Sequence, residues 1–210
     1  MIAPVTASLN LMVVAGFAFA VASSGAELRT TFVDPVAPEV AAIRQAGETA
    51  TAAVAGRLIT ELTTALASGG PEKAVEVCHV KAQPLTRETP PGHPRITAVK
   101  RTSLRLRNPV NAPDAAERAA LDHVAGLITR GEPAPALLVQ RVDTTGKAEP
   151  EWRVYRSVFI QPACLACHGS AEEQSPALRA LLRERYPQDA ATGYNTGDWR
   201  GFLRVTVQQP

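Results

Sequence analysis

Five consecutive residues carry the clearest chemical signal in this chain: Cys164-Leu165-Ala166-Cys167-His168. The spacing C-x-x-C-H is the attachment signature of c-type haem. Two thiols with two residues between them reach both vinyl groups of one porphyrin, and the histidine that follows is placed to coordinate the iron on one face. The sequence therefore predicts one covalently bound haem c, held by Cys164, Cys167 and His168.

Two other kinds of site use part of the same motif. A C-x-x-C pair also serves as a redox dithiol, usually at the start of a helix that follows a strand, and His168 would then have no role. The pair could equally supply half of a zinc site, with Cys78 and His79 as the two further ligands. The adjacent histidine and the following Gly169 favour haem, and so does the export signal that residues 1–26 resemble, described below.

Haem iron can bind a second axial ligand on its other face. Both methionines, Met1 and Met12, lie in the N-terminal segment, so a chain without that segment has none to offer. Composition alone leaves four candidates open: Cys78, His79, His93 and His123.

Residues 1–26 have the character of a targeting segment. They contain no charged side chain, and the apolar run from about Leu9 to Val21 is shorter than the ~20 residues of a membrane span. Ala20-Val21-Ala22 fits the small-x-small cleavage pattern, although the segment lacks the usual Lys or Arg near its start. We predict a signal peptide, or an N-terminal anchor if it is not cleaved, and a periplasmic or otherwise exported protein.

The composition is that of one globular domain. The 210 residues are 45% apolar and 20% charged, which excludes a disordered chain. A net charge of +2 and an aromatic content of 5% give no footprint for binding nucleic acid. Three cysteines are too few for a disulfide scaffold.

The long helical pattern comes after a short linker, residues 27–37. Apolar and small residues recur every three or four positions from Pro38 to Leu66. Ser68-Gly69-Gly70-Pro71 is a stop and restart signal, and a second helix is expected over Glu72–Glu88. On that helix Cys78 shares one face with the apolar residues Val75 and Ala82, which is also typical of a cysteine buried as a small hydrophobic residue.

The remainder, to residue 210, alternates strands and helices. We expect strands at Ile96–Leu106, Leu137–Val142, Trp152–Ile160 and Gly201–Val207, and helices at Asp114–Arg130 and Pro176–Arg185. The second and third strands form a hairpin. Antiparallel strands with helices set to one side indicate an α+β domain over residues 38–210.

Four blocks of sequence resemble one family: Lys73–Cys78, Arg105–Asp114, Cys164–Gly169 and Gly193–Gly201. The Arg-Asn-Pro-x-Asn-x-Pro and Gly-Asp-x-Arg-Gly motifs in them are distinctive. The chain is similar to the c-type haem family catalogued as domain of unknown function 3365. The resemblance implies a PAS-like antiparallel sheet with flanking helices and a long N-terminal helix. It also implies that His168 and Cys78 ligate the iron from opposite faces.

Several side chains near these motifs invite specific expectations. Arg105 and Arg107 could pair with a haem propionate through charge-assisted bonds, or be ordinary surface residues of a strand. Asp198 and Arg200 are placed to form an ion pair that closes the turn before the last strand.

An anionic thiolate opposite a histidine favours ferric iron and lowers the reduction potential. If the Cys78 bond weakens on reduction, the sixth position opens. We therefore expect a redox or gas sensor module that acts on a separate redox or signalling protein. The alternative is a small periplasmic electron-transfer cytochrome.

A filled sixth position leaves no open iron for peroxide, so no enzymatic activity is expected. The long first helix could pair in a homodimer. Contact with a membrane is expected only if the N-terminal segment is uncleaved.

Overall fold

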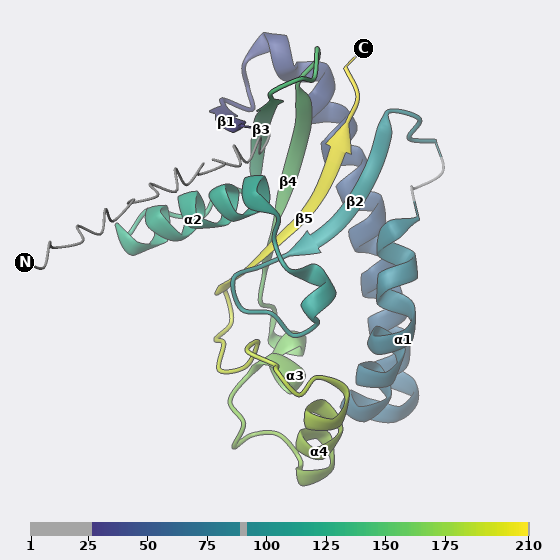
Figure 1. Ribbon diagram of the computed structural model, residues 1–210. Helices are drawn as coiled ribbons and strands as arrows, with labels where there is room; N and C mark the ends of the chain where they lie inside the picture. The colour runs from purple at the N-terminus through teal and green to yellow at the C-terminus, as the bar shows by residue number, and fades with distance from the viewer. Residues whose placement is uncertain (1–26, 89–91, 210) are drawn as a thin grey trace, which may run out of the picture.

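The computed structural model describes residues 27–88 and 92–209 (Figure 1). The strands are β1 (Leu28–Val33), β2 (Ile96–Thr102), β3 (Leu137–Thr144), β4 (Glu151–Phe159) and β5 (Trp199–Val207). The helices are α1 (Ala41–Arg87), α2 (Ala115–Thr129), α3 (Leu165–His168) and α4 (Pro176–Arg185), with 3-10 turns at Pro38–Val40, Pro109–Asn111 and Pro162–Cys164. The predicted signal peptide, 1–26, lies outside the described residues.

The five strands form one antiparallel sheet in the order β1-β3-β4-β5-β2. The last strand of the chain therefore lies between β4 and β2. The α+β class, the antiparallel sheet with flanking helices and the long N-terminal helix predicted from the sequence are confirmed.

The expectation of a linker over residues 27–37 is wrong for its first half. Leu28–Val33 form the edge strand β1, which pairs with β3 from Leu28 opposite Thr144 to Val33 opposite Val139. All of its side chains are exposed or only half-buried, so no hydrophobic alternation marks the strand in the sequence. Backbone pairing with β3, rather than core packing, defines it.

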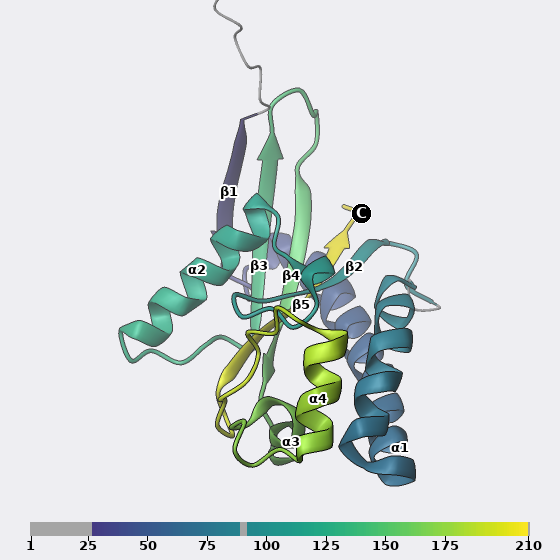
Figure 2. The same cartoon turned by 60° about the horizontal axis from the view of Figure 1, so that its bottom comes forward.

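Helix α1 is a hairpin of two antiparallel arms, as the Gly-Gly-Pro signal predicts. Gly69 and Gly70 leave helical geometry, and Gly70 has a φ of +70°, which a glycine adopts at little cost. The arms, 41–68 and 71–87, lie side by side in Figure 2. An ion pair joins them where Lys81 Nζ lies 2.8 Å from Glu61 Oε2.

The first arm of α1 covers one face of the sheet. Its buried side chains join those of the strands in the largest apolar cluster: Val40, Ile43, Ala50, Val54, Ile96, Val99, Val139, Trp152, Val154, Leu203, Val205 and Val207. At Gly47 the helix backbone approaches β4 so closely that a Cβ would lie 2.4 Å from Val154 Cβ. The apolar face of this arm is thus buried within the domain.

Helix α2 covers the opposite face, where Leu121 and Val124 pack against Tyr155 and Phe202. A capping box starts the helix, with Asp114 Oδ1 accepting from the Glu117 N–H and Glu117 Oε2 accepting from the Asp114 N–H. This N-terminus therefore has a fixed position over the strands.

Glu117, in the first turn of α2, is fully buried between the helix and the sheet, where it also meets two positively charged side chains of the strands. Its carboxylate accepts from Arg204 Nη2 at 2.8 Å and from Lys100 Nζ at 2.6 Å. Buried charges persist only when they are paired and hydrogen-bonded, and this group meets both conditions.

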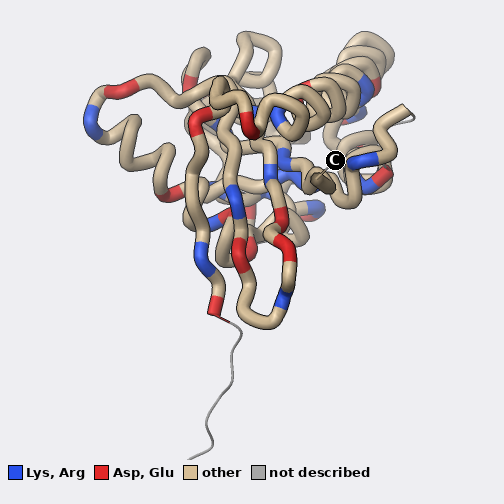
Figure 3. Tube along the Cα trace, turned by 90° about the horizontal axis from the view of Figure 1, so that it is seen from above, with Lys and Arg blue, Asp and Glu red and all other residues tan. Residues whose placement is uncertain are grey.

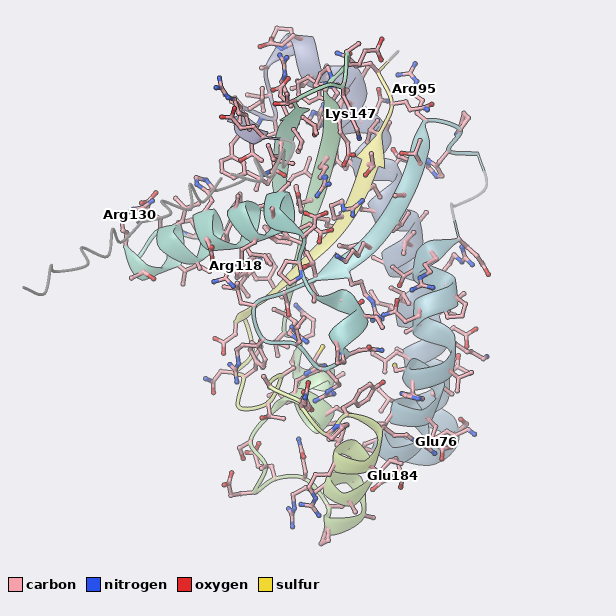
Figure 4. The ribbon with its side chains drawn as sticks, viewed as in Figure 1. Glu76, Arg95, Arg118, Arg130, Lys147 and Glu184 are labelled. Carbon is pink, nitrogen blue, oxygen red and sulfur yellow. The ribbon has the colours of Figure 1, made fainter. Side chains whose placement is uncertain are left out.

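The second arm of α1, α3, α4 and the loop before β5 gather at one end of the molecule, where Figure 4 labels Glu76 and Glu184. Val75 of this arm packs against Leu178, Leu182 and Tyr186 of the α4 region. Along the trace, basic and acidic residues are interspersed (Figure 3). Across 27–88 and 92–209, no helix has the length and apolar character needed to cross a bilayer.

The close approach of α1 and β4 predicts opposite effects of one substitution at two glycines. Gly47→Ala should lower the free energy of unfolding by about 1–3 kcal/mol, because the new methyl group must displace Val154. Gly56→Ala should raise it by about 0.5–1 kcal/mol, because nothing lies within 4 Å of that Cβ and alanine favours the helix. Urea unfolding followed by circular dichroism measures both. Equal effects at the two sites would contradict the packing described.

The buried carboxylate predicts a larger effect on stability. Glu117→Gln should cost about 3–5 kcal/mol, because it leaves Arg204 buried without its counter-charge. Glu132→Gln is the matched control, since that carboxylate pairs with Arg130 at the exposed end of α2 and should change stability by less than about 1 kcal/mol. A small effect at Glu117 in denaturant unfolding would show that the network adds little to stability.

Candidate haem site

The two cysteines of the C-x-x-C-H motif lie on one helical turn. The 3-10 turn Pro162–Cys164 runs directly into α3, so Cys164 and Cys167 are three residues apart on one side of that turn. Both thiols are free and half-buried. The Gln161 N–H points to Cys164 Sγ at 3.4 Å and fixes the entry to the turn.

His168 is held through one ring nitrogen. Its Nδ1 lies 2.7 Å from the carbonyl oxygen of Ala191, which can only accept, so Nδ1 carries the proton and Nε2 keeps a free lone pair. Burial, reinforced by the nearby positive charges of Arg107 and Arg200, lowers the pKa of His168 to about 3. The imidazole is therefore neutral, which is the form that binds a metal.

The loop that supplies the Ala191 carbonyl is tied to the motif along its backbone. The Tyr194 N–H donates to the His168 carbonyl at 2.9 Å, and the Gly193 N–H donates to the Gly169 carbonyl at 2.7 Å. A side chain at Gly169 would not fit, because its Cβ would lie 2.7 Å from the Leu165 carbonyl oxygen. The residue after the motif thus has to be glycine for this close packing.

Cys78 of the second arm of α1 lies beside the motif. Val75, one turn before it, packs in the cluster that also touches Cys167. Burial raises the pKa of the Cys167 thiol, Arg107 lowers it and the neighbouring Cys78 raises it further. Burial also raises the pKa of Cys78, against the opposing effect of Arg101 and Arg107. The structure therefore brings Cys78 and Cys167 into one environment.

The histidines considered as second ligands lie elsewhere or face outward. His79 is exposed and meets Tyr186 edge-on with the ring centroids 5.3 Å apart. His93 lies against the start of α1 with Ala42 and Gln45. His123 stacks on Phe32 across α2 and β1, at 4.4 Å between centroids.

Arg107 joins three parts of the site. Its Nε pairs with Asp189 Oδ2 at 2.9 Å, while its Nη2 donates to the carbonyls of Cys167 at 2.5 Å and Ala191 at 3.2 Å. Arg107 is therefore neither an ordinary surface residue nor free to give its Nε and Nη2 to a propionate, because the protein itself occupies these two donors.

Arg105 is also committed to the loop before β5. Its Nε donates to the Ala190 carbonyl at 3.0 Å, and its guanidinium lies 4.1 Å above the ring of Tyr194. A cation over an aromatic face is stabilised by the ring quadrupole. Arg105 thus acts on the loop rather than on a carboxylate.

The predicted ion pair between Asp198 and Arg200 is wrong. Asp198 Oδ2 instead accepts from the Asn195 N–H at 2.7 Å and closes its own turn. Arg200 turns the other way, where its Nη1 donates to Ser103 Oγ at 2.6 Å. A local carboxylate-to-backbone bond satisfies Asp198 without ordering a second long side chain.

The donor set fits a haem. Over 27–88 and 92–209, no three His, Cys, Asp or Glu side chains converge as a bare metal site. A porphyrin supplies four nitrogen donors itself, so its iron needs only axial ligands from the protein. Around the motif lie Arg101, Arg107 and Arg200, and the Nε of Arg101 is buried without a partner. Nothing in the sequence distinguishes Arg101 from the other arginines of the strands, so its place at the site could not be predicted.

The comparisons with known proteins agree with the sequence motifs. The model of the Tll0287-like family matches residues 23–208. Among solved structures, the crystal structure of the cyanobacterial heme-protein Tll0287 matches with a TM-score of 0.45 and 23% identity, over 83% of this chain and 98% of that chain. No curated protein matches significantly. Because the family match spans nearly the whole chain, this protein belongs to the Tll0287-like family, the one catalogued as domain of unknown function 3365.

Proposed function

We propose that this protein binds one haem c covalently through Cys164 and Cys167, with His168 as an axial ligand. The observation that carries the proposal is the geometry of the C-x-x-C-H turn. Both thiols lie on one side of the turn, and the His168 Nδ1–H donates to the Ala191 carbonyl, which leaves Nε2 free. A hydrogen bond from the other ring nitrogen to a carbonyl orients a metal-ligating histidine in this way. Membership of a family named after a haem protein is in keeping with it.

Cys78 is the proposed second axial ligand, as the family resemblance implies. Its support is its position beside Cys167 on the second arm of α1, whereas His93 and His123 contact other parts of the domain. When bound, the haem would supply one-electron redox chemistry and, with its sixth position open, a site for a diatomic gas. Arg101 and Arg107 would favour the thiolate form of Cys78 by their charge.

A redox or gas sensor is the role that this arrangement supports best, because Cys78 lies on an arm that can transmit its movement. The arm rests on α4 through Val75 and connects through Gly69 and Gly70 to the arm that covers the sheet. A change at Cys78 would therefore reach the central sheet. The signal would pass to a separate redox or signalling protein, and no catalytic step is proposed for the chain.

Export is part of the same proposal. Its support is the uncharged segment 1–26 with its small-x-small pattern, together with the C-x-x-C-H motif, because c-type haem is attached in exported proteins. We infer a periplasmic or otherwise exported location for the mature chain.

Covalent attachment is tested by mass. The full chain, produced together with haem-attachment machinery, should be coloured and have the mass of the polypeptide plus one haem. Replacing both Cys164 and Cys167 with Ala should return the mass to that of the polypeptide, because no thioether bond can form. Cys78→Ala is the control and should keep the added mass. A colourless chain with the mass of the polypeptide alone would refute the proposal. The same mass measurement locates the mature N-terminus.

The second ligand is tested by spectroscopy. Cys78→Ala should abolish the low-spin thiolate signal in the magnetic-resonance spectrum and raise the reduction potential, because an anionic donor is lost. His79→Ala, the exposed neighbour on the same arm, should leave both unchanged. A wild-type ferrous spectrum that stays six-coordinate with thiolate and takes up no carbon monoxide would contradict a gas sensor and favour the electron carrier.

A further inference from the structure

The two arginines of the sheet whose side chains are classed as buried, Arg153 and Arg204, each meet a carboxylate. Arg153 Nη1 donates to both oxygens of Asp114, at 2.8 Å each. Arg204 donates through Nε and Nη2 to Glu117 Oε1, at 3.0 and 2.8 Å. Burial of a guanidinium costs free energy, and a hydrogen-bonded carboxylate offsets that cost.

Arg101 departs from this pattern. Its Nε is buried and has no hydrogen-bond partner, and no carboxylate of the described chain pairs with it. On β2, Arg101 lies two residues after Val99, so its side chain is on the face that α1 covers. The side chain as a whole is half-buried, and a buried Nε without a partner points to an anion that the polypeptide does not supply.

Arg200, close to Arg101 in the fold, also lacks a carboxylate partner. It donates to the hydroxyl of Ser103, which is two residues beyond Arg101, and among the described residues no acidic side chain pairs with it. Its guanidinium lies 5.5 Å from the ring centroid of Tyr194, which in turn meets the His168 ring edge-on at 6.3 Å. Two arginines without carboxylate partners therefore lie beside the proposed axial ligands.

Asp189 is an acidic residue of the same site, but its carboxylate already has other hydrogen-bond partners. It pairs with Arg107 and also accepts from the Ala191 N–H at 2.8 Å, so it holds the loop rather than Arg101 or Arg200. No ion pair joins Asp189 to Arg101 or Arg200, so their donors are not taken up by this carboxylate.

We propose that Arg101 and Arg200 bind the propionate carboxylates of the haem, an assignment that rests on the proposed haem site. Arg105 and Arg107 already donate through Nε and Nη2 to the protein, whereas Arg200 donates only through Nη1 and no partner of Arg101 is found in the described chain. Arg101 and Arg200 therefore have the most donors left for a bound anion. Arginine binds carboxylates with two parallel N–H donors, and a haem carries two such groups.

The test uses the haem-loaded full chain and the variants Arg101→Gln and Arg200→Gln. Arg156→Gln is the matched control, because Arg156 is an exposed arginine of β4 in the same sheet. The measurements are the propionate-bending bands in the resonance Raman spectrum and the midpoint potential. Both test variants should shift the bands and lower the potential, because a positive charge beside the iron favours the ferrous state. The control should change neither.

Unchanged propionate bands in Arg101→Gln or Arg200→Gln overturn the assignment of that arginine, even if the potential moves. Repeating Arg101→Gln in a Cys78→Ala background separates the rival partner. If the effect disappears there, Arg101 pairs with the Cys78 thiolate and the assignment fails. If a Gln variant does not mature, Arg101→Lys or Arg200→Lys keeps the charge but loses the two-donor geometry, and should still shift the bands. A wild-type chain without added haem mass refutes the proposed function itself.

Discussion

The fork of hydrogen bonds at Arg107 is the interaction on which the site depends. One guanidinium reaches the carbonyl of Cys167, the carbonyl of Ala191 and the carboxylate of Asp189. These groups come from the C-x-x-C-H turn and from the loop before β5, which are far from Arg107 in the sequence. Since the Ala191 carbonyl also receives the His168 proton, the same fork places the acceptor that orients the imidazole. A lysine could not reproduce this geometry, because its ammonium has no fixed planar fork.

Two regions of the sheet differ in how their positive charges are paired. Under α2, the buried cations Arg153 and Arg204 meet Asp114 and Glu117, so that region is complete and serves stability. Near the C-x-x-C-H turn, Arg101 and Arg200 have no such partners within the described chain. The contrast separates the region whose buried charges are paired within the protein from the region where the propionates of a haem are proposed to bind.

The elements with strong local signals could be predicted from the sequence. The Gly69-Gly70-Pro71 break, the Asp114 cap and the β3–β4 hairpin all correspond to observed features, because turn and capping chemistry is local. Strand β1 was missed because its partner β3 is more than a hundred residues away and its side chains are largely exposed. The roles of Arg107, Arg101 and Arg200 were missed or misassigned for the same reason: a guanidinium can reach carbonyls, carboxylates or a ligand, and only tertiary contacts decide which.

The helical hairpin explains how Cys78 can be both well placed and movable. A single straight helix would fix Cys78 through the whole apolar face that packs on the sheet. The break at Gly69 and Gly70 instead places the thiol on a second arm, whose buried side chains are small: Ala74, Val75, Ala82 and Thr86. Small side chains remove less apolar surface from water than Ile43 and Val54 of the first arm, so the second arm is held less firmly. Elements with less buried apolar surface open at lower free energy than the core, and that difference would let the proposed change in Cys78 ligation move the second arm relative to the sheet.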